Sequence, residues 1–230
     1  MFNKPSLAFL SSLTTDFTPV IKGFAHQTYI PLDLSIHQNL LSTSVLFNPV
    51  QMQERLTQWL HKNQAEVAFG GYMELRKIYD RSMHFLTDEA QKRNLHLGVD
   101  FWAAAETPVV APIAGRVHSL ANNEGYGNYG PTLLLEHQIS GHQFFSLYGH
   151  LSLASLSLLQ QGDLVKAGDT IGFLGDARVN GDYAPHLHFQ LILDIENYVG
   201  DYPGVARALE KPYYLKNCPD PNILLKYKSA

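Results

Sequence analysis

The chain has 230 residues, of which 45% are hydrophobic and 17% are charged, and this composition excludes an intrinsically disordered chain. The net charge of −4 gives no basis for a nucleic-acid partner or for attraction to an anionic membrane surface. No apolar run approaches the ~20 residues that a membrane span needs.

Cysteine and histidine usage is uneven, with one cysteine, Cys218, against eleven histidines. A single cysteine excludes an intrachain disulfide framework and a thiolate-rich zinc site. A bound metal would therefore use imidazole and carboxylate ligands. Residues 1–16 lack the ~7–15-residue apolar run and the cleavage site of a signal peptide. We expect a cytoplasmic chain or export without a leader, and a periplasmic or secreted location is the alternative.

Residues 1–90 are expected to form a small α/β accessory region. Residues 1–45 show no sustained periodicity. Asn48 and Pro49 then resemble a helix cap and first helical position. Apolar side chains follow at helical spacing and predict a helix over 49–65: Met52, Leu56, Trp59 and Leu60. A second, shorter helix is expected over 72–83.

Short β-prone runs separated by glycine, proline, asparagine and aspartate dominate the chain from about residue 95 onward. Such runs, without intervening helices, are typical of antiparallel β folds. We therefore predict a mainly β domain over 91–230, an antiparallel β-sandwich or partly open barrel with a C-terminal extension. The predicted strands lie at 108–120, 132–137, 144–148, 170–174 and 187–193.

Three motifs carry histidines in contexts that suggest chemistry. On a strand, residues i and i+2 project to the same face, so His186 and His188 can reach one site. The motifs are His96-Leu-Gly-Val-Asp100, Tyr148-Gly149-His150-Leu151 and Pro185-His186-Leu187-His188-Phe189.

The spacing of His96 and Asp100 is weak evidence by itself. On a straight strand the two residues would lie about 13 Å apart, so a shared metal requires a bend, which Gly98 between them would permit. His84 and Asp88 have the same spacing but no intervening glycine, and we expect them to lie on a solvated helix face.

A site built from His96, Asp100 and one histidine of the His186/His188 pair would offer three protein ligands. This number is typical of catalytic zinc sites, which leave a position open for water or substrate. The ligand types also suit manganese, cobalt or iron. The other histidine of the pair and His150 would then act as acid/base and oxyanion-stabilising groups.

Together with their flanking sequences, these motifs resemble the lysostaphin/LytM-type zinc metalloendopeptidases, a peptidoglycan-cleaving family with a duplicated-hybrid-motif β fold. The resemblance implies one Zn²⁺ per chain, with His96, Asp100 and His188 as ligands and His150 and His186 as catalytic residues. It also implies hydrolysis of peptidoglycan-type or other small peptides by a metal-activated water. The matching segments span about 95–195 and include Thr107–Val117, Gly127–Tyr129, Leu147–Leu151, Val165–Gly172 and Ala184–Phe189.

Several alternatives remain open at this stage. The flanks at 70–76, 201–205 and 217–222 do not belong to the generic domain, so a substrate outside the cell wall is possible. The run Ala111–Val117 also resembles biotinyl and lipoyl carrier domains, for which Lys166 is the nearest candidate attachment residue. Residues 1–90 either gate the cleft or supplement the core. The sequence predicts no oligomeric state.

Overall fold

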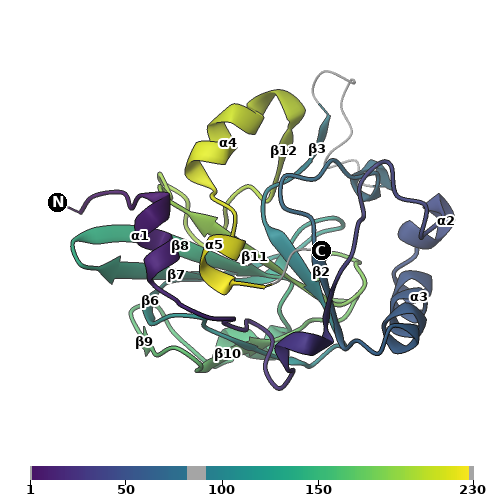
Figure 1. Ribbon diagram of the computed structural model, residues 1–230, viewed down its shortest axis with the longest axis horizontal. Helices are drawn as coiled ribbons and strands as arrows, with labels where there is room; N and C mark the ends of the chain where they lie inside the picture. The colour runs from purple at the N-terminus through teal and green to yellow at the C-terminus, as the bar shows by residue number, and fades with distance from the viewer. Residues whose placement is uncertain (1, 82–91, 228–230) are drawn as a thin grey trace.

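The computed structural model describes residues 2–81 and 92–227 (Figure 1). His84 and Asp88, the second histidine/aspartate pair with four-residue spacing, lie outside the described residues. Within these residues, no helix combines the length and apolar character that crossing a membrane requires.

An open eight-stranded sheet forms the centre of the molecule. Every pairing in it is antiparallel except β1 with β2. The mainly β, antiparallel fold predicted from the sequence is confirmed, and the sheet is not closed into a barrel. Its strands, in spatial order, are β1 (Tyr29–Pro31), β2 (Val67–Gly70), β4 (Val99–Trp102), β11 (His186–Ile192), β8 (His142–Gly149), β7 (Gly130–Ile139), β6 (Gly115–Asn123) and β9 (Leu164–Val165).

Two smaller sheets complete the strands. One pairs β10 (Thr170–Phe173) with β5 (Pro108–Val110), and the other pairs β12 (Val205–Arg207) with β3 (Arg93–His96). The second of these small sheets matters for the site because β3 ends at His96.

Alternation along β11 separates the hydrophobic core from a polar face. Leu187, Phe189 and Leu191 pack into the main core, whereas His186 and His188 face the other way. This is the period-2 pattern of a strand, with the difference that the polar face is also buried. Buried polar side chains must be paired, which directs attention to what the histidines contact.

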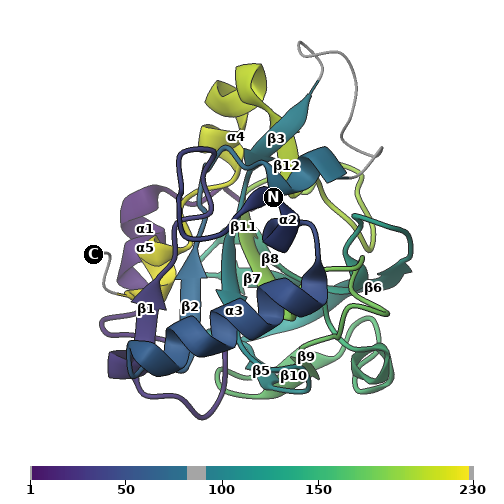
Figure 2. The same cartoon turned by 90° about the vertical axis from the view of Figure 1, so that its right-hand side faces the viewer.

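Helices pack against the sheet at two places. Figure 1 shows α1 and α5, from the two ends of the chain, side by side. In Figure 2, α3 lies along the β1–β2 end of the sheet. The α-helices are α1 (Leu7–Ser12), α2 (Thr43–Leu46), α3 (Pro49–Lys62), α4 (Lys211–Asn217) and α5 (Asn222–Leu225). The 3₁₀ helices are η1 (His26–Thr28), η2 (Ile78–Arg81), η3 (Leu153–Ser157) and η4 (Ala208–Glu210).

Local sequence explains where α3 begins. The Asn48 side chain accepts a hydrogen bond from the backbone N–H of Gln51, and Pro49 occupies the first turn. Met52 and Leu56 are buried one turn apart. The helix lies inside the 49–65 range expected from the sequence.

The helix predicted over 72–83 is wrong for the part that the structure describes, where only η2 is helical. The backbone N–H of Arg76 donates to the Asn94 carbonyl at 2.9 Å, and that of His96 donates to the Glu74 carbonyl at 2.9 Å. Because these long-range hydrogen bonds satisfy the backbone, the segment is extended and lies against β3.

N-terminal residues extend the main sheet, and some of them pack on its polar side. β2 pairs with β4, which places Gly70 opposite Asp100. A second hydrophobic cluster joins N-terminal side chains such as Leu34, Met52 and Ile78 to Trp102 of β4. The N-terminal residues therefore lie directly beside the histidine-bearing strands.

Candidate metal centre and active site

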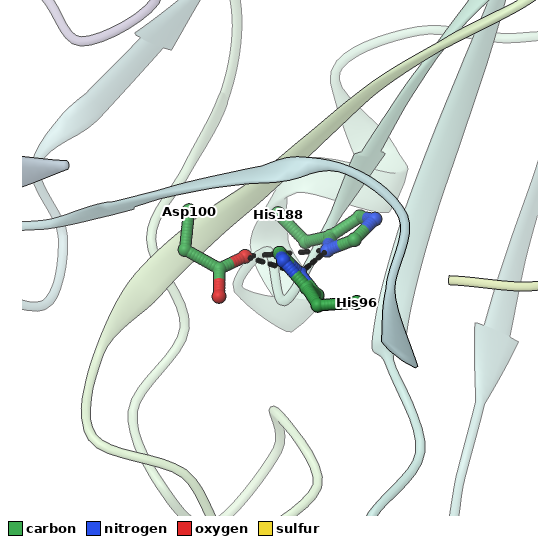
Figure 3. Close-up of side chains that lie close together, drawn as sticks. All are labelled: His96, Asp100 and His188. Atoms are coloured by element: carbon green, nitrogen blue, oxygen red, sulfur yellow. Dashed lines mark hydrogen bonds and ion pairs between the residues drawn. The ribbon is translucent and has the colours of Figure 1, made fainter. Parts of the chain in front are cut away.

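The side chains of His96, Asp100 and His188 converge (Figure 3). The register of β4 with β11 places Asp100 directly opposite His188. The Nε2 atom of His96 lies 2.8 Å from Nδ1 of His188, and both nitrogens lie 3.2 Å from Oδ1 of Asp100. All three residues are at most 2% exposed.

The bend expected at Gly98 is present, because β3 ends at His96 and β4 begins at Val99 in a different sheet. The physical reason differs from the expected one, since Gly98 is not in the left-handed region. A Cβ atom there would lie 2.6 Å from the Phe189 carbonyl oxygen and 2.8 Å from Cε1 of His188. Gly98 is therefore needed for close approach to His188 rather than for backbone freedom.

Hydrogen bonds on the far side of each ring define the tautomers of the two histidines. Nδ1 of His96 lies 2.8 Å from the Gly71 carbonyl oxygen, which only accepts, so Nδ1 carries the proton. Nε2 of His188 lies 2.9 Å from Oε1 of Gln190, whose amide nitrogen donates to a backbone carbonyl. His188 therefore donates through Nε2. The nitrogens that face Asp100 both carry lone pairs.

Three acceptor atoms thus face one another at 2.8–3.2 Å, and the histidine protons point away from the space between them. Such an arrangement is repulsive unless a cation lies between the atoms. A tetrahedral ion with ~2 Å bonds separates its ligand atoms by ~3.3 Å, close to the spacing here. Imidazole and carboxylate donors in this geometry fit a divalent transition metal held by three ligands.

His150 and His186 lie beside this centre, with ring centroids 4.3 Å apart. Nδ1 of His150 donates to the Asn180 carbonyl and Nδ1 of His186 to the Ala184 carbonyl, each at 2.8 Å. Each ring therefore keeps an unprotonated Nε2, and that of His186 is 4.0 Å from Oδ1 of Asp100. His150 follows β8 with a φ of 63°, a strained conformation for a residue other than glycine.

Burial keeps the rings of His96, His150 and His186 neutral. Burial, reinforced by Arg76, lowers the pKa of His96 to about 3. Burial, reinforced by the neighbouring imidazoles, lowers the pKa of His150 well below its ordinary value, and burial also lowers that of His186. At neutral pH the three imidazoles are therefore bases with a free lone pair, which can bind a metal or accept a proton.

Residues 94–199 match the sequence profile of "Peptidase family M23". Over these residues, slightly less than half of the chain, the sequence is similar to the M23 peptidases. The match contains all five residues of the predicted site, and the resemblance to lysostaphin/LytM-type enzymes is confirmed.

The curated relatives that match these residues are larger proteins. An uncharacterized metalloprotease of Haemophilus influenzae is 36% identical over 95 residues, which are 41% of this chain and 18% of that protein. Lysostaphin of Staphylococcus simulans is 36% identical over 100 residues, 44% of this chain and 18% of lysostaphin. The solved catalytic domain of that lysostaphin aligns at 24% identity with a TM-score of 0.40, over 68% of this chain and 96% of the domain. The match spans about a fifth of the length of the curated relatives.

A guanidinium from outside the matched residues completes the metal centre. Arg76 donates through Nη1 to Oδ2 of Asp100 and through Nε to Oε2 of Glu74, both at 2.5 Å. Burial raises the pKa of Asp100, but His96 and Arg76 outweigh it and hold the pKa well below its usual range. Asp100 is therefore ionised, with Oδ2 held by Arg76 and Oδ1 directed at the two imidazoles.

Sequence reasoning missed Arg76 and Glu74. Arg76 is 24 residues from Asp100 along the chain and lies in a segment that was expected to be helical. The only available signal was that residues 70–76 depart from the generic domain.

Replacing Arg76 with methionine is expected to lower the free energy of unfolding of the metal-free chain by about 3–5 kcal/mol. Glu74 and Asp100 would then be buried carboxylates without their cation. Urea denaturation measures the loss. The matched control is Arg178→Met, because Arg178 is 88% exposed in its pair with Asp176 and its loss should change the stability far less. An equally small loss for Arg76→Met would contradict this interpretation.

A cavity of about 270 Å³ opens over the metal centre. Its walls come from three parts of the chain, and only one of them contains the metal-binding motifs. Residues 96–188, which carry the motifs, contribute Trp102, Tyr129, His150, Tyr183 and His186. The N-terminal residues contribute Leu34, Met52, Arg76, Ile78 and Tyr79, and the segment after β11 contributes Tyr198, Asp201, Tyr202, Pro203 and Val205.

Proposed function

We propose that this chain is a zinc-dependent metalloendopeptidase that hydrolyses peptide bonds in peptidoglycan-type or other small peptides. The observation that carries the proposal is the convergence of three lone-pair ligand atoms beside two further neutral histidines. The relatives support it: besides lysostaphin, a protein named peptidoglycan DD-endopeptidase ShyC, of Vibrio cholerae, is 32% identical over 115 residues, 50% of this chain and 23% of ShyC.

The residues divide into two roles. His96, Asp100 and His188 would hold the ion on three sides and leave its remaining position towards the cavity. A bound zinc ion supplies polarisation of the substrate carbonyl and a lowered pKa of the attacking water.

The other two histidines, His150 and His186, would act as the general base and general acid. His150 and His186 each donate through Nδ1 to a backbone carbonyl, which holds the ring and leaves Nε2 free. Nε2 of one ring would accept a proton from the attacking water. Once protonated, that Nε2 would donate a hydrogen bond to the developing oxyanion and deliver its proton to the leaving amine.

The test combines metal analysis with peptide digestion on the full chain. We expect one zinc per chain by mass spectrometry and cleavage of muropeptides or of members of a short-peptide library. A chelator should abolish cleavage, and added zinc should restore it.

Two results would contradict the proposal. Absence of stoichiometric metal would favour the carrier interpretation. Metal-loaded chain that cleaves neither muropeptides nor any library peptide would exclude the peptidase function.

A further inference from the structure

A second hollow of about 330 Å³ adjoins the active-site cavity. Tyr198, Tyr202 and Pro203 line both spaces, so the two share a wall. The other residues of the second hollow are Glu196, Glu210, Tyr213 and Tyr214, and none of them belongs to a metal-binding or catalytic motif.

Four tyrosine rings form the aromatic part of this hollow. The rings of Tyr198 and Tyr202 are 5.0 Å apart at 67°, and those of Tyr213 and Tyr214 are 5.0 Å apart at 83°. Tyr202 is anchored, because it is 1% exposed and its hydroxyl accepts a hydrogen bond from Asn217 at 2.7 Å. Aromatic rings that line a cavity offer a bound cation their negative faces, so a tyrosine-lined hollow suits a cation.

Two carboxylates, those of Glu196 and Glu210, line the second hollow. Glu210 is paired with Arg207 at 2.7 Å. Glu196 accepts a hydrogen bond from the Tyr213 hydroxyl, and among residues 2–81 and 92–227 no lysine or arginine forms an ion pair with it. Glu196 therefore places a carboxylate that forms no ion pair among the described residues beside a space lined by tyrosine rings.

Hydrogen bonds connect the wall between the two cavities to the metal centre. The Pro203 carbonyl accepts a hydrogen bond from the amide nitrogen of Gln190, and Gln190 in turn holds His188. A substrate group in the second hollow would therefore lie at a defined place relative to the ligands.

We propose that this second hollow is a subsite for a primary ammonium group of the peptide that occupies the active-site cavity. The ammonium belongs either to a lysine-type side chain or to a free N-terminus. The peptide nature of the ligand rests on the proposed function, whereas the preference for an ammonium group rests on the tyrosines and Glu196.

Cleavage of matched peptides tests the preference. One series places lysine, acetyllysine or norleucine at successive positions, and a second compares free with acetylated N-termini. At one position the ammonium form is expected to have a kcat/KM about 2- to 30-fold higher, mainly through a lower KM. The two series distinguish a side-chain ammonium from a terminal one.

Substitutions in the second hollow test whether the preference for ammonium substrates arises there. Glu196→Gln removes the charge, and its amide oxygen can still accept from Tyr213. Tyr213→Leu removes a ring that lines only the second hollow. Both should reduce the ratio of ammonium to neutral substrate towards one. Glu54→Gln, on the exposed side of α3, should leave the ratio unchanged.

A binding measurement separates this proposal from the peptidase function. The full chain is titrated with n-butylammonium and with 1-butanol while the tyrosine ring signals are followed by NMR. Saturable shifts with the ammonium alone, lost in Tyr213→Leu, would support the subsite even if no peptide is cleaved. Equal kcat/KM for lysine, acetyllysine and norleucine peptides and for both N-termini would overturn the subsite and leave the peptidase function intact. Absence of ammonium binding would also overturn it.

Discussion

Replacing His188 with alanine is expected to remove the bound metal from the chain and to abolish peptide hydrolysis. The change deletes one of three converging ligand atoms and leaves Nε2 of His96 and Oδ1 of Asp100 as a two-ligand site. The loss in metal affinity should exceed the ~10–100-fold that removal of an outer hydrogen-bond partner costs. Competition with a chromophoric chelator measures the affinity, and His96→Ala and Asp100→Ala should behave alike.

The matched control for these variants is His61→Ala, an exposed histidine on α3. It should keep one metal per chain and the activity of the unaltered protein. If His188→Ala bound metal as tightly as His61→Ala does, His188 would not be a ligand.

Replacing His150 or His186 with alanine is expected to lower kcat by ~10²–10⁴-fold while the chain retains one metal. Each substitution removes a neutral imidazole whose Nε2 is available for proton transfer, and leaves the three ligand atoms in place. Metal content and kcat are measured on the same preparation.

A suitable control for this pair is His118→Ala, since His118 is partly buried on β6 and bonds to Ser119 rather than lining the cavity. Loss of metal in His150→Ala would mean that His150 is a ligand. A kcat within about twofold of the unaltered protein would remove both histidines from the catalytic step.

His186 and His188 show what a local sequence pattern can predict about the site and what it cannot. Period-2 spacing on a strand was enough to predict that both histidines face one site, and both line the cavity. The pattern could not say which of them is closer to Asp100. The register of β11 against β4 decides this, because it sets His188 opposite Asp100 and His186 opposite Trp102.

By itself, the sequence determined the mainly β fold, the helix near 49–65 and the five side chains that gather around the cavity. These depend on short-range features: alternation along strands, a capping asparagine before a proline, and motifs of a few residues. Only the tertiary structure decided that Arg76 and Glu74 hold Asp100, that Gly98 makes room for His188, and that tyrosines after β11 form a second hollow. The physical reason is distance along the chain. Backbone pairing and burial between segments dozens of residues apart bring these groups together, and no local periodicity records such contacts.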